Sequence, residues 1–432
     1  MMMTARLTLL ALLILAGPFY WQESAALDAT AASSNDANTL ETITVTAERR
    51  EESLKDVPMS VTALGGSALD KLQDHDFGDY AAMVPGLSLA SSQPGLTRLT
   101  LRGQNAGGVG STAAVYIDES PFGSSSALLN GATNTGDFDT WDLQRIEVLR
   151  GPQGTLYGAN SEGGLLKFVT TAPVLGSLSG AAEVTGESVD HGGKGGDVRA
   201  VVNLPLGDTV AFRIGGFDAD LPGYINDPLS GEHGVNDGHK QGGRASLLIV
   251  PADSLSIRLT ASSQQSKYNA TNAVDVDPVS LRPVHGDLTQ ERFFKEPSNF
   301  KYKNYNATID WNVGPFSILS TTSYGILHTD TESDFTSAVL SPPSTTLGEI
   351  LAGAFGGSFG ALLDDNVGVK KFTQEIRLSS AASNQLEWQV GGYFTRESGA
   401  LIEHLTALTL PGGALTGLPV SPPGSTSGLG PL

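Results

Sequence analysis

Residues 141–158, WDLQRIEVLRGPQGTLYG, are the stretch that decides the fold. Ile146–Leu149 has the apolar and β-branched composition of a strand, and the following Gly-Pro ends it. A second strand is predicted at Leu165–Thr170, directly after Gly163 and Gly164. These glycines do not predict a phosphate-binding loop, because no Gly-Lys-Ser/Thr follows and the Rossmann spacing is absent. The stretch therefore predicts strands with glycine-rich joints.

Short elements around this stretch predict a compact α+β domain of about 120 residues. Strands are expected at 57–64, 99–102 and 114–117, helices at 67–73 and 76–83, and one helical turn at Asp139–Gln144. Pro85-Gly86 ends the second helix.

Together these motifs resemble the plug-domain signature of TonB-dependent outer-membrane receptors. Besides residues 141–158, the resemblance rests on Val57-Pro58, Val84–Leu87, Leu101–Gly103, Val115–Asp118 and Phe168–Thr170. The segments 159–162 and 165–167 depart from the family pattern and suggest a divergent subfamily.

The resemblance implies a role for two arginines. Arg102 and Arg150 each end a strand immediately before a glycine. The resemblance implies that they bridge the plug to glutamates of the barrel wall, a pairing that is costly to desolvate but geometrically selective. The alternative is a solvated surface arginine in each case.

The N-terminus has the parts of a secretory signal peptide. Leu7–Ala16 is a run of ten apolar residues after one positive charge, and small residues at 24–26 and 29–31 offer cleavage sites. At 1.5 Å per residue this run is about 15 Å long, which is too short to span a membrane as a helix. A buried helix or an uncleaved anchor are the alternatives. We assign residues 1–26 to the signal peptide and expect export to the Gram-negative cell envelope.

Residues 27–52 combine a small, polar linker with one strand-like segment, ETITVTA at 41–47. Its alternating β-branched residues have no neighbouring strand to pair with, which suits addition to another protein's sheet. The pattern alone favours an edge strand of the next domain. However, the segment resembles the TonB box of the family. The resemblance implies TonB binding by these residues: Glu41, Thr42, Ile43, Thr44, Val45, Thr46 and Ala47.

From residue 180 onward, alternating segments are separated by turns rich in Gly, Asp, Asn and Pro. In 304–313 the odd positions are apolar or aromatic and the even positions are polar. Similar segments bring the total to about nine strands: 180–189, 198–204, 210–221, 242–251, 255–262, 316–328, 372–380 and 386–390. Alternation fits a soluble sandwich or a transmembrane barrel, and the signal peptide, the aromatic strand ends and the upstream plug favour the barrel.

The loops of this barrel are expected on opposite sides. The long segments 264–300 and 329–371 are predicted to be extracellular loops, and the short turns at 206–208 and 251–253 to face the periplasm. Glu375 lies in a segment that resembles a barrel strand of the family, and we expect it to be a partner for a plug arginine.

The length of this region does not match a complete barrel. A plugged barrel has about 22 strands. The 253 residues from 180 to 432 would give each of them 11.5 residues, with almost nothing left for loops. Residues 411–432 are also a Pro/Gly/Ser-rich loop without a terminal aromatic. The expected fold is therefore an α+β plug domain followed by antiparallel transmembrane β-barrel strands, an incomplete barrel of about nine of the 22 strands, with the rest of the receptor absent.

Composition argues against other classes of protein. The chain has 26 Lys and Arg against 46 Asp and Glu, a net charge of −20, which does not suit nucleic-acid binding. Cysteine is absent, which removes disulfide scaffolds and thiol nucleophiles. The seven histidines are scattered, and Asp275 and Asp277 lack calcium-loop spacing. We expect no enzyme activity, no cofactor and no metal site.

The resemblance implies energy-dependent import across the outer membrane. Expected partners are TonB, outer-membrane lipid and a small-molecule ligand: an iron–siderophore complex as the commonest family cargo, or cobalamin or another chelate. The protein is expected to be a monomer with a signal peptide (1–26), a linker with the TonB box (27–52), a plug (53–175) and a partial barrel (180–432). The alternative is a truncated, non-transporting fragment or a plug-type signalling or binding module.

Overall fold

The computed structural model describes residues 44–50, 52–72, 77–104, 110–133, 137–277, 279–336, 359–380, 386–409 and 418–419. The predicted signal peptide and the first three residues of the predicted TonB box, Glu41, Thr42 and Ile43, lie outside these ranges. Within them, no helix is both long enough and apolar enough to cross a membrane.

An α+β domain precedes the long sheet. Its mixed sheet has the order β3 (Val61–Gly65), β8 (Leu143–Arg150), β9 (Gly164–Thr170), β6 (Ala113–Ile117) and β7 (Ser120–Phe122), in which β6 and β9 are parallel and the other pairs antiparallel. The remaining elements are α1 (Gly66–Leu72), α2 (Phe77–Ala82), the hairpin of β4 (Leu87–Gln93) and β5 (Leu96–Leu101), η1 (Ala127–Leu129) and α3 (Gly154–Tyr157). The predicted strands and helices of this domain are present within a few residues of their expected positions.

A glycine allows β9 to begin beside the end of β8. Gly164 begins β9 with φ 145°, and a Cβ at this position would lie 2.3 Å from the carbonyl oxygen of Leu149. Because only glycine fits this approach, β9 can start beside the end of β8. The paired strands then bury Ile146, Val148 and Phe168 in the core.

The helical turn expected at Asp139–Gln144 does not form. Residues 137–140 have no regular structure and β8 already begins at Leu143. The cause is long-range, because Asp139 and Asp142 bind arginines of the long sheet. Asp142 also has a positive φ of 59°, which a helix does not allow.

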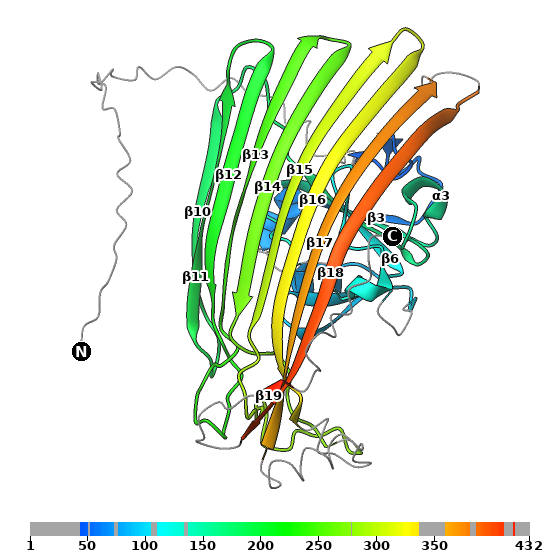
Figure 1. Cartoon of the computed structure of the whole chain (residues 1–432). Coiled ribbons are helices and arrows are strands. Elements are labelled where there is room, and N and C mark those ends of the chain that lie inside the picture. The colour runs from blue at the N-terminus through cyan, green and yellow to red at the C-terminus, as the bar shows by residue number, and fades with distance from the viewer. Residues whose placement is uncertain are drawn as a thin grey trace, which may run out of the picture. The chain divides into compact units, whose positions relative to one another are not determined.

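The long sheet is antiparallel, and each strand pairs with its sequence neighbours (Figure 1). It comprises β10 (Ser179–Ser188), β11 (Lys194–Pro205), β12 (Val210–Leu221), β13 (Gly238–Ala252), β14 (Leu255–Tyr268), β15 (Ser298–Val313), β16 (Phe316–Asp334), β17 (Phe359–Ser380), β18 (Gln389–Thr409) and the two-residue β19 (Leu418–Pro419). The nine predicted strands are confirmed, and several extend further toward the long connections. Residues 329–334 and 359–371 are therefore strand and not loop, contrary to expectation.

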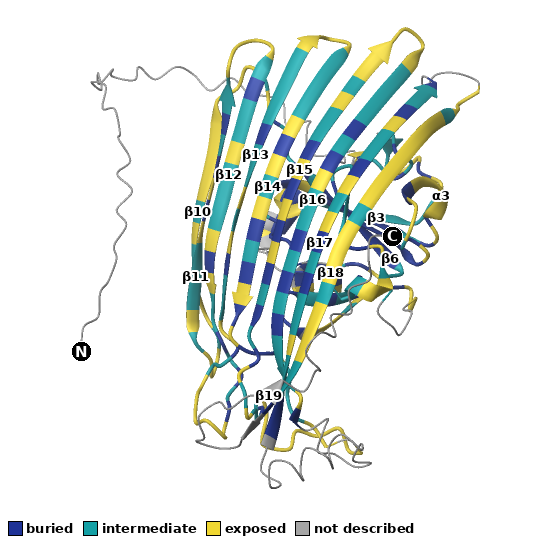
Figure 2. Cartoon of the chain, in the orientation of Figure 1, coloured by how far each residue is buried: buried dark blue, intermediate teal, exposed yellow. Residues whose placement is uncertain are grey.

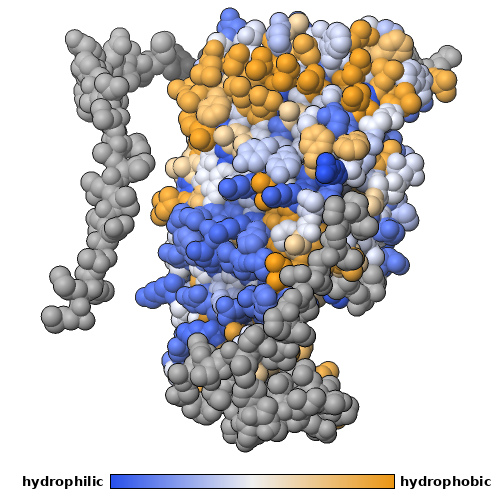
Figure 3. All heavy atoms as spheres, viewed as in Figure 1, coloured by the Kyte–Doolittle hydropathy of each residue, from blue (hydrophilic) through white to orange (hydrophobic). Residues whose placement is uncertain are grey.

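The two faces of the long sheet differ, as the alternation predicted. Buried and exposed residues alternate along the strands (Figure 2). One face packs on the α+β domain. The outer face carries a band of exposed large apolar residues next to the short turns, visible as the orange band of Figure 3. Within the described residues, β10 and β19 end the strand order without pairing to each other, so this sheet is not a closed barrel.

Candidate functional site

The segment Thr44–Ala47 lies against the α+β domain. Its strand β1 (Thr44–Val45) pairs with β2 (Glu52–Ser53). Val45 and Ala47 are fully buried, in an apolar cluster that includes Leu149 and Tyr157. A short strand with half of its side chains buried in this way is held by packing as well as by its partner strand.

Polar contacts hold the same segment at Thr46. Its backbone N–H donates to Glu147 Oε1 at 2.9 Å, and Lys167 Nζ donates to its Oγ1 at 2.8 Å. The Tyr157 hydroxyl donates to the carbonyl oxygens of Thr46 and Ala47. Burial raises the pKa of Tyr157, so this hydroxyl remains a donor at neutral pH.

Arg49 anchors the chain directly after this segment. Its guanidinium lies 4.0 Å from the ring centroid of Tyr157, donates to the carbonyl oxygen of Leu156 and pairs with Glu119 at 2.7 Å. The side chain is 3% exposed. Its φ of 62° turns the backbone into this pocket. Arg49 therefore fixes the position at which the chain leaves the buried segment.

Glu119, in the turn between β6 and β7, is the centre of the charges at this site. It accepts from Arg49, from Lys167 at 2.8 Å and from Arg377 of β17 at 2.8 Å. We call these four residues the Glu119 cluster. Burial opposes ionisation of Glu119, but the positive charges of Lys167, Arg49 and Arg377 outweigh it and hold the pKa of Glu119 well below its ordinary value. One carboxylate thus links the long sheet to the two cations that hold Thr46 and the chain after it.

Further ion pairs join the two domains. Arginines and a lysine on the inner face of the long sheet pair with acidic turn residues of the α+β domain: Arg199 with Asp139, Arg213 and Arg244 with Asp142, Lys240 with Asp137, and Arg258 with Asp118. The distances between the charged atoms lie between 2.5 and 2.8 Å. Desolvated pairs of this kind select one docking geometry.

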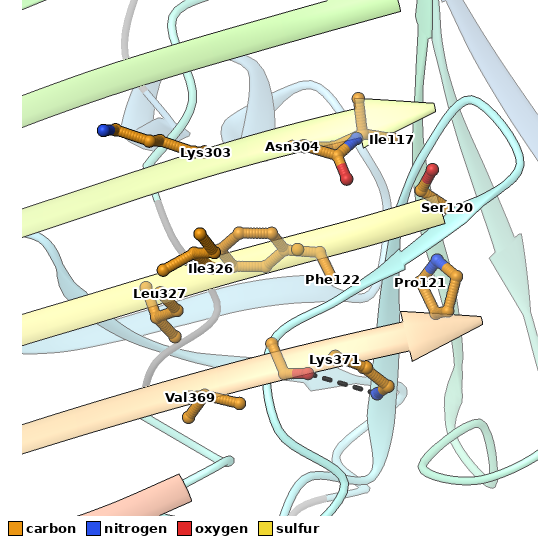
Figure 4. Close-up of a pocket in the computed structure, with 12 residues that line it drawn as sticks. Ile117, Ser120, Pro121, Phe122, Lys303, Asn304, Ile326, Leu327, Val369 and Lys371 are labelled. Carbon is orange, nitrogen blue, oxygen red and sulfur yellow. Dashed lines mark hydrogen bonds between the residues drawn. The ribbon is translucent and has the colours of Figure 1, made fainter. Parts of the chain in front are cut away.

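An apolar seam completes this interface. Phe122 and Phe138 pack against Tyr302 of β15 with ring-centroid distances of 5.7 and 4.8 Å. Figure 4 shows the β6–β7 hairpin lying across β15, β16 and β17, with Lys371 Nζ donating to the carbonyl oxygen of Gly123. The β6–β7 hairpin, which carries Glu119, is therefore packed directly on β17, the strand whose Arg377 pairs with Glu119.

The family described as TonB-dependent Receptor Plug Domain matches residues 53–165. Over residues 53–165 the chain matches the TonB-dependent receptor family. The α+β domain is its plug domain, and the long sheet corresponds to its barrel strands.

Two curated relatives and one solved structure illustrate the likeness. The chain is 28% identical over 222 residues to "Vitamin B12 transporter BtuB" of Vibrio vulnificus, covering 48% of this chain and 32% of the relative. It is 23% identical over 307 residues to "Probable TonB-dependent siderophore receptor PirA" of Acinetobacter baumannii, covering 65% and 39%. The ferric yersiniabactin uptake receptor FyuA of Yersinia pestis superposes with a TM-score of 0.62 at 16% identity, covering 81% of this chain and 50% of that receptor. The chain thus spans between a third and a half of the length of these proteins.

The predicted bridging residues occupy different surroundings from those expected. The Arg150 guanidinium donates to the carbonyl oxygen of Pro85 at 3.1 Å, and Arg102 is exposed beside Gly151. Both line an open cleft of about 460 Å³ on the plug. Glu375 lies 3.8 Å from Arg49 and 3.3 Å from Arg377. In the described part of the chain neither Arg102 nor Arg150 pairs with a barrel carboxylate, and their bridging role stays a prediction.

Several residues of this site were not identified from the sequence. Arg49 belongs to a charged run, and Asp118 ends a motif that was used only to recognise the plug. Glu119 lies in none of the quoted motifs, and Lys167 lies in the segment 165–167 that departs from the family pattern. One signal was available: the charged Asp118-Glu119 pair stands in a tight turn between two apolar strands, where a carboxylate is costly without a partner.

The histidines and acidic loop residues do not form a metal site in the described ranges. No group of three or more His, Cys, Asp or Glu is placed there to hold a metal ion. His239 contacts Asp220, and Asp275 pairs with Arg292. Burial alone would lower the pKa of Arg292. The hydrogen bonds and negative charges of Asp275 and Glu296 outweigh this effect and raise the pKa, so Arg292 stays ionised in this loop.

Proposed function

We propose that the chain acts in the outer membrane as a TonB-dependent receptor that imports a small-molecule ligand. The apolar band on the outer face supports a membrane position, because soluble monomers rarely expose a continuous band of large apolar side chains. Iron–siderophore complexes are the first ligand class to test and cobalamin the second, since curated relatives are named for both.

The observation that carries this proposal is the burial of Val45 and Ala47, together with the contacts of Thr46, in the described part of the predicted TonB box. Thr46 is held by Lys167, Lys167 by Glu119, and Glu119 by Arg377 of the barrel. A ligand that shifts the β6–β7 turn relative to β17 would break the contact of Glu119 with Arg377. Lys167 and Arg49 would then lose their shared anchor, and the segment would become available to TonB as an added strand.

Binding of the purified periplasmic domain of TonB tests this step. Val45→Pro removes the backbone donor that an added strand needs, and it should abolish TonB binding while the barrel still folds. Val45→Ile keeps the donor and the β-branched shape and is the matched control. Equal TonB binding by both variants would refute strand addition at this segment.

Uptake tests the transport function. Cells that carry the receptor should accumulate radiolabelled ferric siderophore or radiolabelled cyanocobalamin, and deletion of residues 41–47 should stop accumulation while surface binding of the same probe persists. Accumulation without residues 41–47 would exclude the TonB mechanism.

A non-transporting binding module is the second candidate, because the end strands of the described sheet do not pair. Surface binding of the probe without any accumulation, with and without residues 41–47, would favour it.

A further inference from the structure

The outer face of the barrel strands contains an apolar groove of about 400 Å³. Three alanines form its floor: Ala245 of β13 pairs with Ala261 of β14, and Ala307 of β15 lies in the neighbouring row. Larger side chains form its rim: Phe212, Leu247, Leu259, Tyr305 and Tyr324. Small residues between large ones leave a slot of a width and polarity that suit an acyl chain.

Lysines follow the groove on the side of the long connections. Tyr305 on the rim is followed, at alternate positions of β15, by Lys303 and Lys301, and Lys267 on β14 is the diagonal neighbour of Lys301. All three are exposed, whereas Tyr302 and Asn304, which flank Lys303 in β15, are buried, so the lysines share the outer face. Residues spaced by two along a strand are about 7 Å apart, within reach of one phosphate group.

Three acidic residues of the same face contact histidines and not these lysines. Asp218 and Asp220 contact His239, and Asp330 contacts His328. Within the described ranges, Lys267, Lys301 and Lys303 form no ion pair. In Figure 3 the hydrophobic band gives way to a hydrophilic area over the same strands. The charge on this area is therefore available to a partner outside the protein.

We propose that the groove and these three lysines form a binding site for a phosphorylated lipid, with an acyl chain in the groove and the phosphate on the lysines. The site rests on the membrane position proposed above. Lysines at the boundary of an apolar band reach the headgroup level of a bilayer, and each contributes about fivefold to binding an anionic headgroup. A neutral lipid would gain only the groove, so the site discriminates by headgroup charge.

Spin-labelled lipids test the site in bilayers of phosphatidylcholine that contain the protein. The probes are spin-labelled phosphatidic acid and spin-labelled phosphatidylcholine, and the measured quantity is the protein-bound fraction of each. The test variant carries Lys267→Gln, Lys301→Gln and Lys303→Gln. The control variant carries Lys55→Gln, Lys71→Gln and Lys295→Gln, three exposed lysines away from the groove.

The expected result is a preference for phosphatidic acid that falls on the order of 100-fold in the test variant and is unchanged in the control. Ala261→Phe should fill the groove and weaken binding of both probes. A preference unaffected by the three lysines would overturn the proposal, as would complete displacement of the probe by inorganic phosphate.

Protease protection of the barrel strands separates this proposal from the proposed function. Protection without lipid preference removes the lipid site alone, whereas absence of protection removes the membrane position and the lipid site together.

Discussion

Replacing Glu119 by glutamine should release the buried segment Val45–Ala47 of the predicted TonB box. Glu119 is 16% exposed, and its partners Arg49, Lys167 and Arg377 are only 3%, 2% and 7% exposed. Removing one charge from a buried ion pair typically costs 3–5 kcal/mol. Glutamine keeps the shape and the acceptor oxygen, and Glu375 still faces two of the cations, so we take the lower end, about 3 kcal/mol. That corresponds to roughly 150-fold in the population of the released segment.

The absence of cysteine makes this change measurable. Val45→Cys introduces a single thiol at a fully buried position, and its modification rate reports how often the segment opens. We expect Glu119→Gln to accelerate this modification by about 150-fold. A thiol introduced instead by Val279→Cys, at a position that is 91% exposed, should react at one rate in both backgrounds.

Glu375→Gln is the matched control for the loss of charge. Glu375 also approaches Arg49 and Arg377, but at 3.8 and 3.3 Å. Its replacement should therefore change the modification rate of the Val45→Cys thiol by less than about tenfold. If Glu119→Gln left the rate unchanged, or if Glu375→Gln matched it, the cluster would not hold the segment.

Three further predictions concern the same interface. Lys167→Met should raise the modification rate of the Val45→Cys thiol as Glu119→Gln does, and the two changes should combine non-additively in a double-mutant cycle, because each breaks the same pair. The pKa of Glu119 is lowered on folding, so its stabilising effect is complete above the unfolded pKa of about 4.3 and is lost as pH falls toward the folded pKa. Modification of the same thiol by an acid-tolerant disulfide reagent should thus be flat from about pH 8 to 5 and rise below about 4, and Glu119→Gln should remove that rise; a rise that persists would exclude Glu119 as the titrating group. Asp142→Asn leaves Arg213 and Arg244 without their carboxylate, which should weaken plug docking by about 3 kcal/mol and speed limited proteolysis of the plug. Asp190→Asn should change neither quantity, because the Asp190 side chain is 94% exposed and, within the described residues, pairs only with His191.

The barrel strands were predictable where their two faces differ. In 304–313 apolar residues alternate with polar ones, and β15 contains all of that segment. The prediction fell short near the long connections, where 329–334 and 359–371 are strand. There the outer face is itself polar, with residues such as Lys370 and Asp330, so alternation leaves no contrast in hydropathy.

The site was predictable only as far as the motifs extended. Resemblance predicts a TonB box at residues 41–47 but not the contacts that hold this segment, because those contacts join distant positions. Arg49 and Glu119 are 70 residues apart, Thr46 and Lys167 are 121 apart, and Glu119 and Arg377 are 258 apart. The helical turn predicted at Asp139–Gln144 failed for the same reason, since local propensity is overridden by charges contributed from the barrel.

Side-chain length and backbone geometry explain which side of each plug–barrel ion pair carries the positive charge. The resemblance implies that plug arginines reach barrel glutamates, which stays a prediction for Arg102 and Arg150. In the ion pairs that β11–β14 form with the plug, the inner wall supplies the cations and the plug supplies the carboxylates. Long arginines on rigid strands can reach across to a turn, whereas the short carboxylates of Asp118 and Asp142 suit the positive φ that those turns require. This arrangement also lets a chain of net charge −20 seat an acidic plug, because the inner wall neutralises carboxylates that would otherwise be buried unpaired.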